Sequence, residues 1–305
     1  MRSPAVPATY PVLRAAGVLW RFSRPHTIVG TTLSVIGLYL IAVAERAPAG
    51  GAGDLAATLV AALTVNVAIV GLNQLTDIEI DRVNKPRLPV AAGDLSRAAA
   101  AWIVAGSTAV PVAMALTQGT AESVAVLAAL TVGALYSLPP VRLKRFPLAA
   151  SLSITGVRAL AVNLGVYAHF GADAIAPPVW ALCLFVLPFS FAIAVLKDVP
   201  DLEGDRAFAI RTFTVRLGPR TAFRLGLAAL ALAYGGMATL GPWLLAGHAE
   251  PALLIAGHVG AAALLATWAR RVDAADRADV ARFYMRVWGL FFLEYALVPA
   301  ACLAR

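Results

Sequence analysis

Long apolar runs separated by short polar stretches dominate the chain. A bilayer-spanning helix needs about 20 predominantly apolar residues, and membrane helices tolerate Gly and Pro interruptions. Runs of this kind occupy 27–44, 55–76, 98–115, 120–136, 148–170, 178–197, 221–240, 250–268 and 283–303. The pattern predicts an all-α integral membrane bundle of about nine transmembrane helices. We expect residues 1–305 to form one domain, with 1–22 as an N-terminal cytoplasmic lead-in.

The composition agrees with the hydrophobic pattern. The chain is 60% hydrophobic and 14% charged, and its mean hydropathy is +0.78. Soluble domains carry about a quarter charged residues, so this balance argues against a soluble protein. The first 26 residues contain four arginines but no cleavage site after a short apolar core. We therefore expect no cleavable signal peptide and no transit peptide.

Positive charge alternates from one connection to the next. The segments 1–26, 79–97, 137–147, 198–220 and 269–282 contain 19 Lys and Arg residues, whereas the intervening connections and the C-terminus contain Arg46 and Arg305. The positive-inside rule places the first set in the cytoplasm. We expect a cytoplasmic N-terminus, an outside C-terminus and, from the Ala- and Arg-rich composition, a bacterial inner membrane. Part of the net charge of +8 anchors the protein to anionic lipid, and we expect no nucleic-acid partner.

Two acidic motifs follow apolar runs on the predicted cytoplasmic side. The first is Asp77-Ile78-Glu79-Ile80-Asp81 and the second is Asp201-Leu202-Glu203-Gly204-Asp205, and each leads into basic residues. A single such motif is typical of a solvated helix face. Their recurrence at equivalent positions, in a chain with only 17 acidic residues, indicates two related halves that share a function.

Helical spacing separates the members of each motif. Residues four apart share one helix face, so Asn73, Asp77 and Asp81 should lie together. Asp201 and Asp205 should do the same, with Asp198 three residues before them. Glu79 and Glu203 fall on the opposite side, and we expect neither glutamate to bind a metal directly.

Clustered carboxylates next to Lys and Arg are typical of a metal–diphosphate site. Mg²⁺ prefers oxygen ligands and is often completed by substrate phosphates, while guanidinium and ammonium groups bind the remaining phosphate oxygens. An apolar cavity below such a site would suit an isoprenoid tail. The chemistry implied is ionisation of an allylic diphosphate, with the departing charge stabilised electrostatically and water kept from the carbocation.

Several stretches resemble the UbiA superfamily of intramembrane prenyltransferases, and within it most closely the homogentisate prenyltransferase branch. The resemblance rests on the motifs N-x-x-x-D-x-x-x-D and D-x-x-x-D. It is carried by "SRPHTIVGTTLSVIGLY" (23–39), "GLNQLTDIEIDRVNKPRLPVAAGDLS" (71–96), "YSLPPVRLKRFPL" (136–148), "KDVPDLEGDRAFAIRTFTVRLG" (197–218) and "RFYMRVWGLFFLEY" (282–295).

The resemblance implies a nine-helix bundle around one central cavity that opens to the cytoplasmic side. It also implies two Mg²⁺ ions, one held by Asn73, Asp77 and Asp81 and the other by Asp198, Asp201 and Asp205. The expected reaction transfers a prenyl group from a prenyl diphosphate to an aromatic ring carbon. Homogentisate, losing CO₂, is the expected acceptor, and 4-hydroxybenzoate or a specialised-metabolite phenol is the alternative.

Other polar residues are candidates for binding the two substrates. The candidates for contact with the diphosphate are Lys85, Arg87, Arg142, Lys144, Arg145, Lys197 and Arg206. Lipid anchoring is the alternative for some of them. Lys144 is also a candidate catalytic residue. For acceptor binding, the candidates are Arg24, His26, Tyr136, Arg158 and Asn163. Ionisable groups within membrane spans are functional candidates, but Arg158 and Glu294 could instead form a structural pair. Packing is the alternative for His26 and Tyr136, as it is for the aromatic residues of 284–295.

Two other functions remain open from the residues alone. A terpene cyclase of the same superfamily would carry similar aspartate motifs and quench the carbocation within the prenyl chain. A transporter could use paired acidic motifs to bind cations. Its carboxylates should then lie near the bilayer midplane, between broken helices, whereas these are predicted at helix ends among Lys and Arg.

Overall fold

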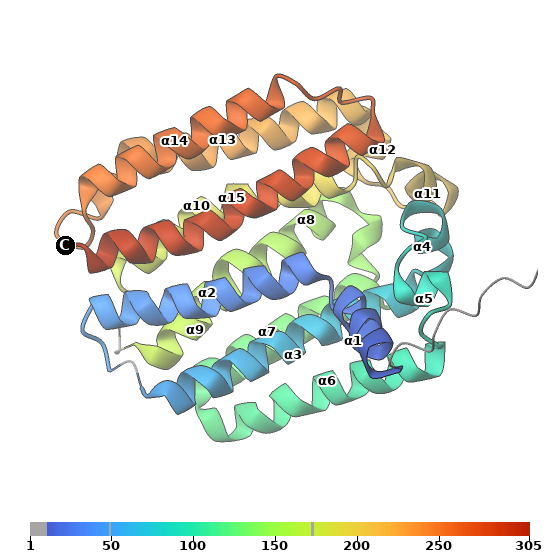
Figure 1. The fold of residues 1–305 in the computed structure, drawn as a ribbon, viewed down its shortest axis with the longest axis horizontal. Helices are drawn as coiled ribbons and strands as arrows, with labels where there is room; N and C mark the ends of the chain where they lie inside the picture. Colours follow the sequence, from blue (N-terminus) through green and yellow to red (C-terminus); the bar gives the residue numbers. More distant parts are fainter. Residues whose placement is uncertain (1–10, 49, 172–173) are drawn as a thin grey trace, which may run out of the picture.

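The computed structural model describes residues 11–48, 50–171 and 174–305, and over these residues the protein is an all-helical bundle (Figure 1). Nine spans of the described chain are long and apolar enough to cross a membrane, which confirms the predicted fold class. They are α2 (Pro25–Ala44), α3 (Ala52–Thr76), α6 (Arg97–Gln118), α7 (Thr120–Ser137), a composite span Pro147–Phe170, α10 (Pro177–Lys197), α13 (Pro219–Leu244), α14 (Pro251–Ala269) and α15 (Arg277–Leu303). The chain is an integral membrane protein.

The composite span differs from the uninterrupted helix predicted over 148–170. It consists of α8 (Pro147–Gly156), a π-helical turn η2 (Val157–Ala161) and α9 (Val162–Phe170). Hydropathy does not distinguish an α-turn from a π-turn, because both bury the same apolar residues. A π-turn inserts an extra residue and often occurs at a functional site, and this one contains Arg158.

Local sequence signals explain where many of the helices begin. Proline is favoured at the first helical position, where its missing N–H is not needed. It begins α2, α8, α10, α13 and α14. Ser96 caps α6 by accepting a hydrogen bond from the Ala99 N–H, and Asp276 caps α15 in the same way through the Ala278 and Asp279 N–H groups.

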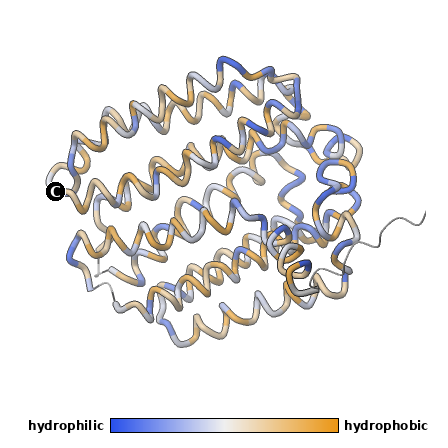
Figure 2. Tube along the Cα trace, in the orientation of Figure 1, coloured by the Kyte–Doolittle hydropathy of each residue, from blue (hydrophilic) through white to orange (hydrophobic). Residues whose placement is uncertain are grey.

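Short helices gather at one end of the bundle, which we call the motif end because it carries both acidic motifs. They are α1 (Pro11–Phe22), α4 (Ile78–Asn84), α5 (Pro89–Ala92), η1 (Leu143–Arg145), α11 (Leu202–Ala207) and α12 (Phe213–Leu217). Figure 2 shows hydrophilic residues concentrated there, at the right of the view, while the long helices are mostly hydrophobic. Helix α1 was not predicted; residues 1–10 of the predicted lead-in lie outside the described residues.

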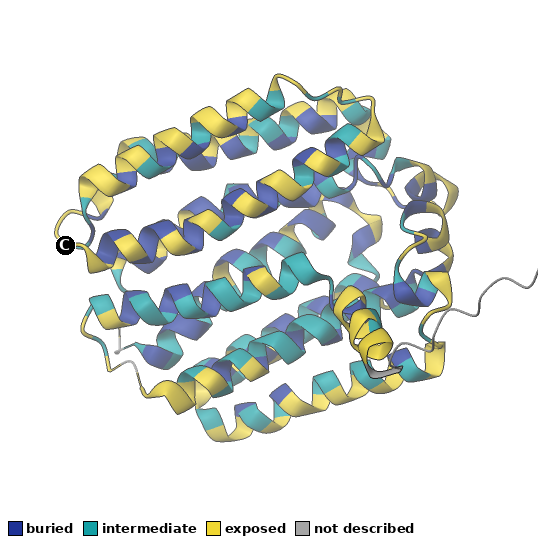
Figure 3. Cartoon of the chain, in the orientation of Figure 1, coloured by how far each residue is buried: buried dark blue, intermediate teal, exposed yellow. Residues whose placement is uncertain are grey.

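The long helices divide into a buried centre and an exposed periphery (Figure 3). Of the nine described spans, α10 has the largest buried share, 72%, followed by α15 with 61%. Helix α10 packs against α13, α8 and α15, and α15 packs against α2. By contrast α6 and α14 present many exposed apolar side chains, as expected of helices that face lipid. Helices α3 and α10 both end at the motif end, where each leads into one acidic motif.

Candidate active site

Each acidic motif lies across a break between two helices. Helix α3 ends at Thr76, Asp77 has φ −118° and ψ 20°, and α4 begins at Ile78. The predicted single helical face for Asn73, Asp77 and Asp81 is therefore wrong in detail, because the chain bends at Asp77. The Asp81 N–H still donates to the Asp77 carbonyl at 2.7 Å, so the side chains keep the spacing of one helical turn.

Both motifs line one cavity of about 590 Å³ at the motif end. All six predicted metal ligands contribute to its wall: Asn73, Asp77, Asp81, Asp198, Asp201 and Asp205. The five aspartates are at most 9% exposed. Glu79 and Glu203 are exposed and instead form surface ion pairs with Arg82 and Arg277. The structure thus separates the aspartates from the glutamates as the spacing predicted.

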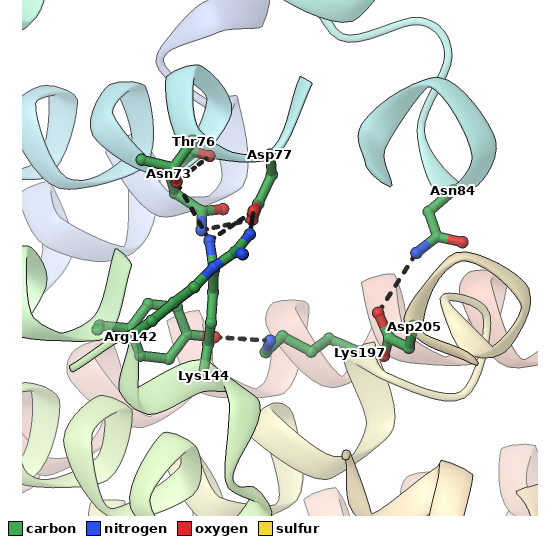
Figure 4. Close-up of polar contacts among 9 residues, drawn as sticks. Asn73, Thr76, Asp77, Asn84, Arg142, Lys144, Lys197 and Asp205 are labelled. Carbon is green, nitrogen blue, oxygen red and sulfur yellow. Dashed lines mark hydrogen bonds and ion pairs between the residues drawn. The ribbon is translucent and has the colours of Figure 1, made fainter. Parts of the chain in front are cut away.

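In the first motif, Asp77 is surrounded by basic side chains (Figure 4). Lys144 Nζ lies 2.5 Å and Arg142 Nη2 3.1 Å from Asp77 Oδ1, and the Asn73 amide donates to Asp77 Oδ2 at 3.0 Å. Lys144 also donates to the Thr76 hydroxyl at 3.1 Å. Burial lowers the pKa of the Lys144 ammonium, although Asp77 opposes this effect. The buried lysine and Asp77 hold each other in place across the cavity wall.

In the second motif, two lysines neutralise two aspartates. Lys85 pairs with Asp201, and Lys197 Nζ lies 3.0 Å from Asp198 Oδ1. Lys197 also donates to the Tyr136 hydroxyl at 3.2 Å. Because Lys85 follows α4, the first motif supplies the cation for an aspartate of the second. The two motifs are therefore coupled by an ion pair as well as by a common cavity.

Asn84 joins the two motif helices, and the sequence analysis missed it. Its Oδ1 accepts from the Gly204 N–H at 2.9 Å, and its amide approaches Asp205 Oδ1 at 3.5 Å (Figure 4). Arg277 adds a hydrogen bond to the Asn84 carbonyl at 3.2 Å. The signal was available, since Asn84 lies three residues after Asp81 and therefore on the same face of α4.

The remaining carboxylates are crowded and short of positive charge. Burial, followed by the charges of Asp198 and Asp201, raises the pKa of Asp205 to about 7. Burial raises the pKa of Asp81 to about 6 against the opposing charges of Lys85 and Arg24. Burial raises the pKa of Asp198 as well, although Lys197 pairs with it and opposes this effect. Asp81 Oδ2 is buried and has no hydrogen-bond partner among the described residues.

These carboxylates suit a divalent cation that is completed by substrate. Among the residues described, no three Asp, Glu, His or Cys side chains stand close enough to ligate one ion. Mg²⁺ does not need such a cage, because it is usually held by one or two carboxylates together with phosphate oxygens and water. The unpartnered Asp81 oxygen and the raised pKa of Asp205 indicate groups that a cation would stabilise.

The structure brings only some of the predicted diphosphate ligands to the cavity. Lys85, Arg87, Lys144 and Lys197 line it, and Arg142 reaches its wall through Asp77. Arg145 and Arg206 are exposed and do not contribute to the lining. Their predicted contact with diphosphate therefore has no support in this geometry, and their exposure fits the alternative of lipid anchoring.

A second cavity, of about 290 Å³ and mostly apolar, extends from the first into the bundle. The two cavities share the wall residues Arg24, His26, Asn73, Tyr136, Lys197 and Tyr284. Three of the predicted acceptor residues, Arg24, His26 and Tyr136, thus lie at the junction. A ring bound there would meet the diphosphate site on one side and the apolar cavity on the other.

Arg158 projects into the second cavity from the π-turn. Its guanidinium carbon lies 4.7 Å from the centroid of the Trp288 ring and 5.4 Å from that of Phe291, a cation–π arrangement. Its Nη1 is buried without a hydrogen-bond partner among the described residues. The alternative of an Arg158–Glu294 pair is wrong, because Glu294 lies 3.1 Å from His258 Nε2 instead.

The other predicted acceptor residues have different environments. Arg24 takes a left-handed backbone conformation, with φ 54°, at the start of α2, and its buried Nε has no partner among the described residues. His26 packs edge-on against Trp288 with a centroid separation of 4.8 Å. Asn163 is fully buried and accepts from the Tyr295 hydroxyl at 2.6 Å. It lines neither cavity, so the structure gives it a packing role.

Known proteins resemble this chain in sequence and in fold. The model of the UbiA prenyltransferase family matches residues 30–290. A homogentisate phytyltransferase of Synechocystis sp. is 46% identical over 92% of this chain and 94% of its own length. Homogentisate phytyltransferase 1 of Arabidopsis thaliana is 37% identical over 92% of this chain and 74% of its own. The structure of a UbiA homolog from Archaeoglobus fulgidus bound to GPP and Mg²⁺ has a TM-score of 0.66 and 18% identity, covering 93% of this chain and 99% of that one.

Proposed function

The chain belongs to the UbiA prenyltransferase family, and on that premise we propose that it transfers a prenyl group from a prenyl diphosphate to homogentisate. The observation that carries the proposal is the pair of adjoining cavities. One is lined by both aspartate motifs with interleaved lysines. The other is mostly apolar and contains Arg158, whose Nη1 has no hydrogen-bond partner among the described residues. A transporter does not need such an arrangement, because its substrate is not split at a diphosphate.

In this proposal the polar cavity binds the diphosphate. Asn73, Asp77 and Asp81 would hold one Mg²⁺ ion, and Asp198, Asp201 and Asp205 would hold a second. When bound, the metal supplies positive charge to the oxygens of the leaving diphosphate. Lys85, Arg87, Lys144 and Lys197 would bind the remaining oxygens by charge-assisted hydrogen bonds. The ion pairs of Lys85 with Asp201 and of Lys144 with Asp77 would then be exchanged for contacts with substrate.

The acceptor would bind at the junction of the cavities, with its carboxylate on Arg158. The guanidinium lines the adjoining apolar cavity, and its Nη1 has no hydrogen-bond partner among the described residues. A buried charged group strongly favours an opposite charge. His26, Tyr284 and Trp288 would pack around the ring. As the new ring carbon–prenyl bond forms, the ring loses a proton and the diphosphate departs. Loss of CO₂ leaves the side-chain methylene, which takes up a proton to become a methyl group.

We also propose the orientation that the charge distribution predicts. The motif end would face the cytoplasm of a bacterial inner membrane, and the C-terminus would lie outside. The strong bias of Lys and Arg toward connections at the motif end supports this assignment. Water-soluble diphosphate product would then leave on the side where it can be hydrolysed and reused.

The test is a product assay with protein purified in detergent. Homogentisate and Mg²⁺ are supplied with phytyl, geranylgeranyl or solanesyl diphosphate in turn, and products are identified by mass spectrometry. We expect a prenylated, decarboxylated quinol with at least one donor and none when EDTA removes the metal. Absence of product with every donor would overturn the proposal.

Two control reactions separate the alternatives. Replacing homogentisate with 4-hydroxybenzoate tests the choice of acceptor. If product forms with 4-hydroxybenzoate and not with homogentisate, the acceptor is not homogentisate. Omitting every acceptor tests cyclisation. A hydrocarbon released from the donor by itself would identify a terpene cyclase.

A further inference from the structure

A buried polar cluster lies at the end of the apolar cavity farthest from the aspartate motifs. Glu122 in α7 accepts from the Thr58 hydroxyl of α3 at 3.2 Å, and His169 Nδ1 of α9 lies 3.4 Å from the same carboxylate oxygen. With its amide nitrogen turned toward the carboxylate, Gln118 donates to both Glu122 oxygens at 2.5 and 2.7 Å. Thr58, Glu122 and His169 all line the cavity.

The cavity connects this cluster to the diphosphate site along α3. Its wall includes residues from each successive turn of α3 between Asn73 and Thr58. Those 15 residues correspond to about 22 Å at the rise of an α-helix. Between Asn66 and the cluster the wall is formed by small and apolar side chains, among them Ala62, Val65, Ala129 and Val162. A chain that begins at the motifs and follows this wall reaches the cluster last.

The cluster is poorly suited to contact with an alkyl chain. Glu122 is 4% exposed, so its carboxyl oxygens depend on polar neighbours for hydrogen bonds. Methyl groups pressed against these polar atoms would offer them no hydrogen bond. The cluster also cannot move aside easily, because its members belong to three different helices.

We propose that the Thr58–Glu122–His169 cluster limits the length of the prenyl donor by ending the part of the cavity that an alkyl tail occupies. This inference rests on the proposed function, since it assumes a prenyl diphosphate whose head lies at the aspartate motifs. It assigns the cluster a role in specificity, with no part in the bond-forming step. The protein then favours donors whose tails stop short of the cluster.

The test compares two double variants that differ only in polarity at the same positions. In Glu122→Leu/His169→Leu both partners are replaced together, so neither is left unpaired. Glu122→Gln/His169→Gln keeps polar groups there and serves as the matched control. The measurement is kcat/KM for geranylgeranyl and for solanesyl diphosphate in each protein, with folding checked by size-exclusion chromatography.

The wild type should favour geranylgeranyl over solanesyl diphosphate. The apolar variant should raise the solanesyl-to-geranylgeranyl ratio about tenfold, which corresponds to 1.4 kcal/mol, whereas the control should leave it within about twofold. An equal change for both donors would show a merely structural cluster and overturn the inference, as would a wild-type preference for solanesyl. If the wild type uses neither of these donors nor phytyl diphosphate, it is the proposed function that fails; if it uses phytyl diphosphate alone, phytyl diphosphate replaces the geranylgeranyl donor in the comparison.

A second measurement needs no variant and no acceptor. A geranylgeranyl diphosphate analogue with a diazirine at the end of its tail is bound to wild-type protein with Mg²⁺ and photolysed. The cross-linked peptides should contain residues lining the far half of the cavity, including Glu122 or His169. Cross-links confined to other parts of the protein would place the tail elsewhere and overturn the inference even if the double variants do not fold.

Discussion

Lysine side chains pair with carboxylates of both acidic motifs. Lys144 holds Asp77, Lys85 holds Asp201 and Lys197 holds Asp198. A buried carboxylate without a counter-charge is costly, so these pairs stabilise the ligand-free site. The same lysines have long side chains with several rotatable bonds, so they could turn to phosphate oxygens if a cation took over the carboxylates. The ion pairs are thus compatible with metal binding.

Removing one motif aspartate should abolish turnover while the bundle stays folded. We expect Asp201→Ala to lower kcat/KM by about 100-fold or more, since the loss of one group that stabilises the leaving charge has effects of this size. Asp77→Ala should behave alike. Steady-state assays of the purified variants measure the effect, and size-exclusion chromatography reports folding.

Glu203→Ala is the matched control for Asp201→Ala. Glu203 lies two residues away, but its side chain is 74% exposed and pairs with Arg277 at the surface. Surface ion pairs of this kind contribute little to stability, so kcat/KM should stay within about twofold of the wild type. Full activity in both aspartate variants would refute the assignment of the motifs as metal ligands.

Arg158→Leu should act on the acceptor and spare the donor. Charge-assisted hydrogen bonds contribute about 1.5–3 kcal/mol, so we expect KM for homogentisate to rise about 10- to 100-fold. KM for the prenyl diphosphate should change little, because Arg158 does not line the motif-end cavity that is proposed to bind the diphosphate. Initial rates with each substrate varied in turn give both constants. An equal rise in both would indicate that Arg158 supports the cavity as a whole.

At the residue scale, sequence reasoning succeeded where spacing alone decides position. The aspartates and Asn73 could be found because positions four apart stay together even across the bend at Asp77. The partner of Glu294 could not be predicted from the sequence, because the packing of α14 against α15 brings His258 next to Glu294. Asn163 was misassigned for the same reason, since only packing shows that it faces Tyr295 rather than a cavity.

At the scale of elements, the contact between α4 and α11 holds the two motifs in register. Gly204 makes that contact possible, because an added Cβ would lie 2.6 Å from Cγ, Oδ1 and Nδ2 of Asn84. The Asn84 side chain would have to move, and the hydrogen bond that it accepts from Gly204 N–H would be lost or weakened. The distance between Asp81 and Asp205 therefore depends on a residue without a side chain.

We accordingly expect Gly204→Ala to reduce kcat/KM about fivefold while the protein remains folded, because a displaced hydrogen bond of this kind is worth about 1 kcal/mol. Gly235→Ala in α13 is the control, since a Cβ there meets nothing within 4 Å. Activity assays and thermal unfolding in detergent distinguish the two variants. If Gly204→Ala keeps wild-type kcat/KM, the α4–α11 contact does not set the motif geometry.

Helix breaks were the features of the elements that sequence could not predict. Hydropathy located the span 148–170 but gave no sign of the π-turn at Val157–Ala161, because side-chain polarity does not record which carbonyl an N–H contacts. The bend at Asp77 was likewise hidden, since no Pro or Gly marks it. Both breaks direct polar side chains into the cavities, and both arise from packing between helices.

At the scale of the whole molecule, the order of spans and connections was predictable. Each span needs enough apolar residues to satisfy the bilayer, and the helix satisfies its own backbone, so local composition decides the architecture. An apolar cavity next to a diphosphate site could be predicted, but the shape of the cavities could not. Their walls are formed together by side chains from helices that include α2, α3, α7, α9, α10 and α15. Their volume follows from packing across elements distant in the sequence.

The bias of positive charge also predicts how the whole bundle sits in its membrane, and two alanine positions can test it. Ala207 is exposed in α11 at the motif end, and Ala304 is exposed after α15 at the other end. The native Cys183 and Cys302 are buried, so Ala207→Cys and Ala304→Cys each add one accessible thiol. In intact bacterial cells a membrane-impermeant maleimide should label Ala304→Cys but leave Ala207→Cys unlabelled until the cells are permeabilised. The opposite pattern would reverse the orientation and show that the Lys- and Arg-rich connections lie outside, where the positive-inside rule does not permit them.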